Sequence, residues 1–223
     1  MYNDSKVLIN VMPNKISENL IEKIERLSTS LLADAMDSFG VMKCDIRPIS
    51  PGMRVIGTAI TVKVRPGDNL FLHKAIYLAG KGYVLVLDSS EHKASAVWGE
   101  MMARGAIAMG LEGVVLDGSV RDLAVLRDLG LPIFANGTIP NGMSRNGPGL
   151  INSDISCGGV SVSPGDLVFG DDDGVVIVPS NILETVISLA EKKQEQELIR
   201  IKEIEQGILE PDWIDKNIFK MSK

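Results

Sequence analysis

The sequence predicts a mixed α/β domain with a β/β/α core and helices at both ends. Two patterns carry this prediction. Between residues 70 and 136, stretches with helical spacing alternate with short apolar runs, which favours a parallel sheet with helical crossovers. After residue 150 the helical stretches give way to short β-segments joined by tight turns. No change in composition marks a linker, so residues 1–223 are expected to form a single domain without tandem repeats.

Two short helices are predicted near the N-terminus, in a helical segment covering about residues 14–40. Apolar residues recur at helical intervals in 15–27. A second helix is expected to begin at the capping oxygens of Ser28-Thr29-Ser30 and to end at Gly40. An irregular stretch then leads to Pro51-Gly52.

The middle of the chain, about residues 52–179, is expected to form the β/β/α core. Alternating β-branched residues and continuous apolar runs indicate strands, and helical spacing indicates the segments between them. The expected strands are 54–65, 83–88, 113–117 and 132–135, and the expected helices are 70–80, 94–109 and 121–130.

Turns and a second set of β-segments complete this core. Asp117-Gly118-Ser119 is expected to turn the chain, and the Gly-, Asn- and Pro-rich residues 136–150 are expected to form a long loop. Later β-segments are expected at 155–162, 164–171 and 174–179. Asp173-Gly174 is a strong hairpin signal between the last two segments.

One long charged helix is predicted from residue 180 to about residue 207. Its apolar positions Ile182, Val186 and Leu189 are expected to face one side. The tail that follows, residues 208–223, carries Trp213 and Phe219, and these aromatic residues favour a docked tail.

Composition and charge narrow the classes of partner. Apolar residues make up 45% of the chain and charged residues 23%, which is typical of a globular protein. The net charge is -6, and no long run of Lys and Arg occurs. Both observations argue against nucleic acid or an anionic membrane as the main partner, although a local basic pocket for a small carboxylate remains compatible with them.

The scarcity of cysteine and histidine indicates a reduced, cytoplasmic protein without a zinc site. Cys44 and Cys157 lack metal-type spacing, and two histidines are too few for a histidine-rich zinc site. The N-terminus lacks the basic and apolar pattern of a signal peptide. No apolar run approaches the ~20 residues that a membrane span requires.

Two of the expected strands lead into loops that carry charged and polar residues, and Arg121-Asp122 follows one of these strands. Ligands of open α/β sheets bind beyond the carboxyl ends of strands. An acid in the first turn of a helix is favoured by the helix dipole, so Asp122 has a plain structural explanation. Arg121 does not, and a bound carboxylate with a developing enolate would explain it. The alternative is a surface arginine paired with Glu112 or Asp117.

The second candidate site segment is Gly99-Glu100-Met101-Met102. A glycine inside a helix is costly, so Gly99 either permits close helix packing or marks the start of a helix. A helix that begins at Gly99 would offer free backbone N–H groups to a carboxylate. Glu100 would then lie beside the carboxylate pocket, where it could act on a proton directly or through water. Its alternative role is on a solvated helix face.

Several other polar residues are expected to serve structure. Asp171-Asp172-Asp173-Gly174 lacks the spaced oxygens and final glutamate of a calcium loop and favours a hairpin turn. Asp68 and Asn69 are expected to cap a helix. His73 is expected to be packed or hydrogen-bonded rather than catalytic, and His92 to be solvated.

These motifs resemble those of the RraA-like family, which includes 4-hydroxy-4-methyl-2-oxoglutarate aldolases and the RNase E regulator RraA. The resemblance runs from about Thr29 to Pro179 and includes LLADAMDSFG, GTAITVKVRPGDNL, WGEMMARGAIAMGLEGVVLDGSVRD and SCGGVSVSPGDLVFGDDDGVVIVP. Its most specific part is Gly99-Glu100 followed, after residues 101–120, by Arg121-Asp122.

The resemblance implies a swivelling β/β/α fold in a ring-shaped homotrimer, sometimes doubled to a hexamer. It also implies that the backbone of Gly99, Glu100, Met101 and Met102 binds the carboxylate of a pyruvoyl group. Arg121 would steady the keto oxygen as it becomes an enolate, and Asp122 would hold Mg²⁺ or Mn²⁺. The family's aldolases usually carry Asp where this chain has Glu100, which lengthens the reach of that side chain by one methylene.

The function implied is that of a class II, divalent metal-dependent pyruvate aldolase. Such an enzyme cleaves a 4-hydroxy-2-oxo acid such as 4-hydroxy-4-methyl-2-oxoglutarate to pyruvate and a second oxo compound. Oxaloacetate decarboxylation is expected through the same enolate. The alternative is a non-catalytic RraA-like regulator that binds a protein such as RNase E. A phosphohistidine carrier is disfavoured, because only His92 could serve it.

Overall fold

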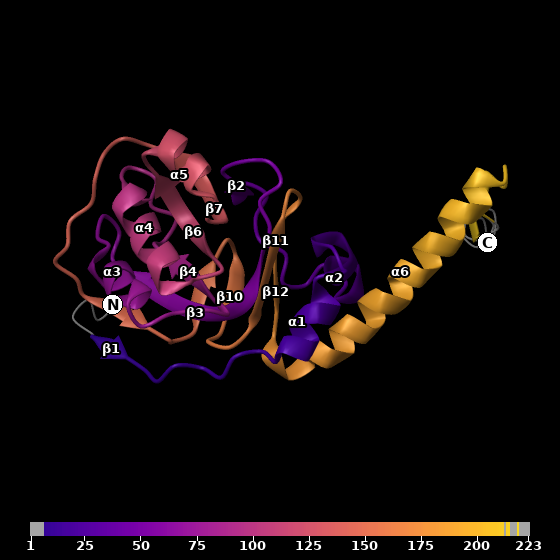
Figure 1. Cartoon of the computed structure of the whole chain (residues 1–223), viewed down its shortest axis with the longest axis horizontal. Coiled ribbons are helices and arrows are strands. Elements are labelled where there is room, and N and C mark those ends of the chain that lie inside the picture. Colours follow the sequence, from indigo (N-terminus) through magenta and orange to yellow (C-terminus); the bar gives the residue numbers. More distant parts are fainter. Residues whose placement is uncertain (1–6, 212, 215–217, 219–223) are drawn as a thin grey trace.

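A large mixed sheet organises the body of the chain (Figure 1). The computed structural model describes residues 7–211, 213–214 and 218. The sheet has the strand order β1-β8-β3-β4-β6-β7-β2, with β5 beside β6 and the β11–β12 hairpin beside β3. The strands on this path are β1 (Leu8–Ile9), β8 (Gly149–Ile151), β3 (Val55–Val64), β4 (Tyr83–Asp88), β6 (Gly113–Val120), β7 (Ile133–Thr138) and β2 (Arg47–Pro48).

The predicted parallel sheet is confirmed at its centre. Strands β3, β4, β6 and β7 pair in parallel along their neighbouring edges. Helix α3 (Leu70–Ile76) connects β3 to β4, and helix α5 (Leu123–Leu129) connects β6 to β7. The carboxyl ends of these strands therefore gather at one edge of the sheet.

The two faces of the sheet pack into separate cores, because successive strand residues point to opposite faces. On one face, Leu85 and Leu87 pack with α3, α4 (Glu100–Met109) and α5. On the other face, Val84 and Val86 pack with the hairpin of β9 (Ile155–Cys157) and β10 (Val160–Val162). This arrangement of hairpin, sheet and helices is the predicted β/β/α core.

A third core joins both ends of the chain. Helices α1 (Glu18–Ile24), α2 (Thr29–Ala35) and α6 (Leu183–Glu205) pack with the hairpin of β11 (Leu167–Asp171) and β12 (Gly174–Val178). The predicted hairpin is confirmed, but its two-residue turn is Asp172-Asp173 rather than Asp173-Gly174, because Gly174 already pairs with Asp171. Both N-terminal helices are shorter than predicted, and the chain reaches Gly40 through turns rather than through helix α2.

Three sequence predictions inside the core were wrong. Residues 96–98 form a strand, β5 (Ala96–Trp98), where a helix was expected from residue 94. Strand β6 continues through 117–119 instead of turning there, because β5 and β7 both pair with its last residues. Strands β7 and β8 occupy both ends of the expected loop 136–150. In each case backbone pairing with a distant segment decides the structure, and local residue type does not reveal it.

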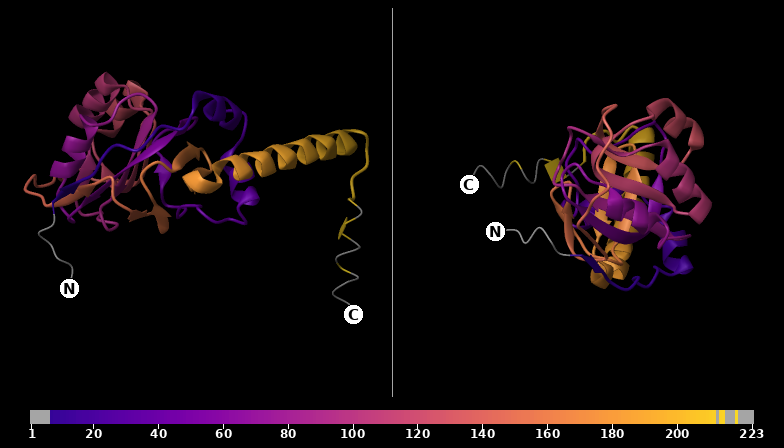
Figure 2. Two further views of the ribbon diagram at one scale, coloured as in Figure 1. Left: turned by 90° about the horizontal axis from the view of Figure 1, so that it is seen from below. Right: turned by 90° about the vertical axis from the view of Figure 1, so that its left-hand side faces the viewer.

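The C-terminal helix leaves the body of the chain (Figures 1 and 2). A short 3-10 turn at Ser180–Ile182 precedes α6. Its buried residues lie in its first turns and end at Ala190, and the helix then extends away from the sheet. Of the three positions predicted to face one side, Val186 is buried, whereas Ile182 and Leu189 are 37% and 45% exposed.

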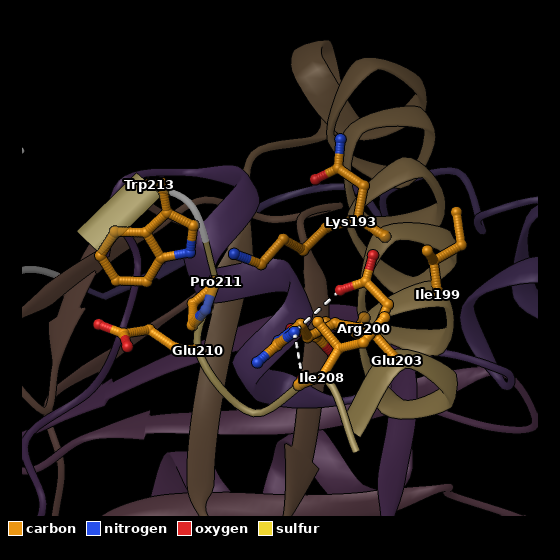
Figure 3. Close-up of a pocket in the computed structure, with 10 residues that line it drawn as sticks. Lys193, Ile199, Arg200, Glu203, Ile208, Glu210, Pro211 and Trp213 are labelled. Carbon is orange, nitrogen blue, oxygen red and sulfur yellow. Dashed lines mark hydrogen bonds and ion pairs between the residues drawn. The ribbon is translucent and has the colours of Figure 1, made fainter. Parts of the chain in front are cut away.

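The described part of the tail contacts the last turns of α6 and then leaves at a steep angle to the helix axis (Figures 2 and 3). Arg200 Nη1 donates to the backbone carbonyl of Ile208 at 3.0 Å. Trp213 lines an open groove with Lys193 and Pro211, but its side chain stays 60% exposed. Phe219 lies outside the described residues. No helix in the described part of the chain combines the length and the apolar character needed to cross a membrane.

The helical face of the sheet supplies a test of the packing. Leu72 is 0% exposed, whereas Leu70 in the same helix is 38% exposed. We expect Leu72→Ala to lower the free energy of unfolding by about 2–5 kcal/mol, because it leaves a cavity in a closed core. Leu70→Ala should cost roughly 1 kcal/mol or less. Urea unfolding followed by circular dichroism measures both, and equal costs would contradict this assignment of the core.

Candidate functional site

Strand β5 and strand β6 run side by side and deliver the two predicted motifs to one place. Their parallel pairing places Trp98 opposite Val120. The Arg121 N–H continues this pairing by donating to the carbonyl of Trp98 at 3.0 Å. Gly99 and Arg121 are therefore the first residues beyond two adjacent strand ends, and helices α4 and α5 begin immediately after them.

A hydrogen bond joins the two motifs. The Glu100 N–H, in the first turn of α4, donates to Oδ2 of Asp122 at 3.0 Å. The Arg121 Nε lies 3.7 Å from the same oxygen. Asp122 adopts the left-handed backbone conformation, with φ of 59°, which is uncommon for residues other than glycine, asparagine and aspartate. That conformation turns the chain sharply between β6 and α5 and brings the carboxylate back toward α4.

The absence of a side chain at position 99 makes this contact sterically feasible. A Cβ atom on Gly99 would lie 2.7 Å from Oδ2 of Asp122 and 3.2 Å from Nε of Arg121. The backbone of Gly99 is extended, so any residue could adopt its conformation. The requirement for glycine is one of space, and close approach of α4 to Arg121 and Asp122 explains it.

All six residues predicted for the site surround one cavity of about 150 Å³. These residues are Gly99, Glu100, Met101, Met102, Arg121 and Asp122. The guanidinium of Arg121 reaches from Gly99 to Gly142, where a Cβ atom would lie 3.1 Å from Nη1. The structure thus brings the predicted residues together, while their catalytic and binding roles stay predictions.

The proposed alternative partners of Arg121 are occupied elsewhere. Glu112 accepts a hydrogen bond from the Gly82 N–H at 2.9 Å. Asp117 accepts bonds from the backbone N–H groups of Ser89 and Glu91. The Arg121 side chain is 44% exposed and faces the cavity instead.

Glu100 and the methionines present different surfaces to this cavity. Glu100 Oε1 accepts a hydrogen bond from Nε of Arg104 at 2.8 Å, one helical turn away on the outer side of α4. The Glu100 side chain is 28% exposed, and Glu100 also lines the cavity. Met102 is 5% exposed and packs into the core, whereas Met101 is 70% exposed at the rim.

Sequence reasoning did not select three polar residues that line the same cavity. Buried polar atoms of Asn69, His73 and Trp98 have no hydrogen-bond partner within the described residues. Asn69 Nδ2 donates to the carbonyl of Val97 at 3.0 Å, which leaves its Oδ1 as the unpaired atom. Buried unpaired polar groups are rare and often belong to binding sites. These unpaired atoms become buried only when α3 packs against β5, so the sequence alone does not reveal them.

A second arginine also lines the cavity and influences His73. Arg145 belongs to the segment after β7, within the stretch predicted as a loop. Burial lowers the pKa of His73 below its usual value, and the charge of Arg145 lowers it further. The imidazole is therefore neutral at neutral pH and presents either a donor or an acceptor to the cavity.

The donor set of this cavity suits a hydrated divalent ion. Within residues 7–211, 213–214 and 218, no three His, Cys, Asp or Glu side chains gather as metal ligands. Asp122 is 40% exposed, and the bond from Glu100 occupies only one of its two carboxylate oxygens. Mg²⁺ commonly takes one or two carboxylates and keeps several waters. Asp122 fits that mode of binding, and a site made entirely of protein ligands is not present in the described chain.

Comparisons with known proteins identify the family of this chain. The model of the family "RraA-like: Aldolase/RraA" matches residues 29–177. A protein of Halalkalibacterium halodurans named "Putative 4-hydroxy-4-methyl-2-oxoglutarate aldolase" is 36% identical over 191 residues, which are 86% of this chain and 91% of that protein.

Solved structures show the same fold. The structure of the RNA-processing inhibitor RraA from Thermus thermophilis is 28% identical with a TM-score of 0.62, covering 68% of this chain and 92% of that one. An uncharacterized protein from Pseudomonas syringae is 28% identical with a TM-score of 0.77, covering 87% and 96%. With a family match over most of the core and a relative aligned along nearly its whole length, this chain belongs to the RraA-like family.

Proposed function

We propose that this chain is a divalent metal-dependent pyruvate aldolase. It cleaves a 4-hydroxy-2-oxo acid, such as 4-hydroxy-4-methyl-2-oxoglutarate, to pyruvate and a second oxo compound, and it decarboxylates oxaloacetate through the same enolate. One observation carries the proposal: the first turn of α4, Arg121 and Asp122 meet at a single small cavity. The name of the Halalkalibacterium halodurans relative supports the same reaction class.

The start of α4 supplies a carboxylate-binding end. Backbone N–H groups in the first turn of a helix have no acceptor four residues earlier. The Glu100 N–H is used by Asp122, and the N–H groups of Met101 and Met102 follow it around the same turn. The positive end of the helix dipole points in the same direction. These groups would bind the carboxylate of the 2-oxo acid.

Arg121 would stabilise the charge that develops on the keto oxygen. When the bond between C3 and C4 breaks, its electron pair forms the C2–C3 double bond and the keto π electrons move onto the C2 oxygen, which gives an enolate. The C4 hydroxyl loses its proton to water and becomes the carbonyl of the second product. A fixed guanidinium beside this oxygen stabilises the charge more in the transition state than in the substrate. Asp122 would hold a divalent ion, which supplies Lewis-acid polarisation of the same oxygen when bound.

The cavity favours a substrate with two carboxylates. Arg121 and Arg145 both line it, so a second cationic side chain remains when the first serves the keto oxygen. A guanidinium binds a carboxylate through paired hydrogen bonds. Glu100 would hold or orient a proton through water, because Arg104 already occupies one of its two oxygens.

A regulatory role is the second candidate. The structural likeness to the RNA-processing inhibitor RraA favours it, since that protein is described as an inhibitor. A regulator that binds a protein such as RNase E would not depend on a charged Asp122. The two functions therefore differ in what a single change at this residue does.

We also propose a cytoplasmic homotrimer or hexamer that acts without nucleic acid or membrane. The net charge of -6 supports the absence of a nucleic acid partner. Exposed apolar residues on the outer half of α6, including Leu198, Ile201 and Ile204, support association between chains.

Asp122→Asn tests the enzyme directly. Asparagine tolerates the left-handed backbone and still offers an oxygen to the Glu100 N–H, so the fold should persist. We expect pyruvate release from oxaloacetate with Mg²⁺ to fall roughly 100-fold, because about 3 kcal/mol of charge stabilisation is lost. Asp128→Asn, on the exposed side of α5, is the matched control and should retain activity. Full activity in Asp122→Asn, or no activity in the unchanged protein above the metal-only blank, would reject the proposal.

Gly99→Ala tests the close approach of α4 to Arg121. The new Cβ must displace Asp122 or Arg121, so we expect kcat/KM to fall roughly tenfold or more with little change in stability. Gly105→Ala is the control in the same helix. Its Cβ would make only ordinary contacts, the nearest at 3.5 Å to the Tyr77 hydroxyl. It should keep activity and raise stability by about 0.5–1 kcal/mol. Equal activities of the two variants would argue against this site.

A further inference from the structure

A buried carboxylate on the hairpin face of the sheet holds the loop that leads into the candidate site. Asp117 of β6 is 2% exposed. Its Oδ1 accepts a hydrogen bond from the Ser89 N–H at 2.6 Å, and its Oδ2 accepts one from the Glu91 N–H at 3.2 Å. The Ser89 hydroxyl also donates to the Asp117 carbonyl at 3.1 Å. One side chain thus satisfies two backbone donors of a single loop.

The backbone of this loop needs that support. Ser90 and Glu91 both have positive φ, of 58° and 56°. Two consecutive residues in the left-handed region are costly unless the surroundings fix them. The carboxylate of Asp117 provides the fixed acceptors on the inner side of the turn.

The same loop positions two walls of the cavity. It runs directly into β5 and Gly99, so it sets where α4 begins. The Ala96 N–H donates to the carbonyl of Asn141 at 2.7 Å, which ties the loop to the segment carrying Gly142 and Arg145. Asn141 Nδ2 also donates to the carbonyl of Ala94 at 3.4 Å, so hydrogen bonds connect the loop with both sides of the cavity.

We propose that Asp117 is a positioning residue for the candidate site, and that its ionised carboxylate acts as a proton-sensitive clamp on residues 89–95. The clamp would tighten the arrangement of β5 and the start of α4 when Asp117 is charged and loosen it when Asp117 is protonated. The link to catalysis rests on the proposed function, but the clamp itself is a property of the loop and can be measured without any substrate.

The charge state of Asp117 changes in a physiological range. Burial raises the pKa of Asp117 to about 6, although hydrogen bonds from Ser89 and Glu91 oppose the shift, and Asp88 raises the pKa further. Above that pH both oxygens accept a backbone N–H. Below it, a proton occupies one oxygen, and that neutral oxygen becomes a weaker acceptor for its backbone N–H group.

The ionisable groups around Asp117 do not prevent its change of charge. Asp88 of β4 is paired with Lys63 of β3, with 2.7 Å between Nζ and Oδ2. Burial raises the pKa of the Cys157 thiol of β9, so the thiol stays neutral. Glu91 and Lys43 form an exposed ion pair at the outer side of the loop. Lys93 and Asp45 form a second exposed pair further along it.

Ionisation of Asp117 has opposite effects on the loop and on the whole fold: it would tighten the loop, but it lowers the free energy of unfolding. Because the pKa of Asp117 is higher in the folded chain than in the unfolded chain, its contribution to stability is fully present below pH 3.8 and is lost as the pH rises through about 6. The clamp is thus formed by a charge that the fold tolerates at a cost, which is typical of a group retained for positioning.

Amide hydrogen exchange from pH 5 to pH 8 tests the clamp in the unchanged protein. After correction for intrinsic exchange rates, we expect the protection factors of the Ser89 and Glu91 amides to rise roughly tenfold through pH 6. The Leu70 and Asn146 amides are internal controls, since both are held by Asp68. Burial opposes ionisation of Asp68, but hydrogen bonds from Asn146 and Leu70 outweigh it and lower its pKa, so these amides should show no transition.

Two variants separate the clamp from general effects of acid. Asp117→Asn should remove the transition and leave the loop poorly protected at every pH. The NH₂ group of asparagine cannot accept a hydrogen bond, so one of the two backbone N–H groups of the loop would face another donor. Asp166→Asn is the matched control. Asp166 is also buried and also accepts two backbone N–H groups, from Ser163 and Ser180, but these lie outside the loop. It should keep the transition at Ser89 and Glu91.

Trp98 reports on the cavity wall independently of activity. In a Trp213→Phe background it is the only tryptophan, and its fluorescence should change with a midpoint near pH 6. A fluorescence transition that persists in Asp117→Asn would arise from another group and would overturn the link between the clamp and the cavity. Constant protection of both amides from pH 5 to pH 8 would overturn the clamp itself, whether or not the Asp117→Asn variant folds.

The outcome for the clamp is separable from that for the proposed reaction. A protein that shows the exchange transition but no oxaloacetate turnover would retain the clamp and lose the aldolase assignment. A protein that turns over oxaloacetate with no exchange transition would retain the aldolase assignment and lose the clamp.

Discussion

The contact between the Glu100 amide and the Asp122 carboxylate is the constraint on which the candidate site depends. It joins the first turn of one helix to the residue that precedes another, and both residues follow strands that lie side by side. The contact requires a glycine at position 99 and a left-handed backbone at position 122. Neither residue belongs to a hydrophobic core. The contact between the two helix ends therefore explains both the glycine at position 99 and the left-handed backbone at position 122.

The side chain of Arg121 lies between the carboxylate of Asp122 and the cavity. Its guanidinium is 3.7 Å from the carboxylate of Asp122, yet one end of it remains directed past Gly142 into the cavity. A partly exposed ion pair of this kind contributes little to stability. It holds a cation and an anion a few ångströms apart, and in the proposed reaction these two charges would face the ketoacid and the divalent ion.

Much of the fold could be predicted from the sequence because its central strands are continuous apolar runs. The segment YVLVLD is buried on both faces and was predicted with its exact bounds as β4. Strand β5 was missed, because Ala96–Trp98 has only three residues and exists through its pairing with β6. The meeting of the Gly99 and Arg121 segments could be predicted because each follows a strand end and the two strands were expected to be neighbours, whereas the roles of these residues were expected from the resemblance to the RraA-like family. Asn69, Trp98 and Asp117 gave no such signal, since only tertiary packing buries them.

Helix α6 is anchored at one end alone. Its buried side chains stop at Ala190, whereas the helix continues to Glu205. Beyond the body it is stabilised by its own hydrogen bonds, and a helical segment of this length is marginal in water. The free energy needed to open each turn must therefore decrease from the root of the helix toward its tip. In a single chain without the proposed partner subunits, fraying begins at the far end and reaches the anchored turns only when the third core itself opens.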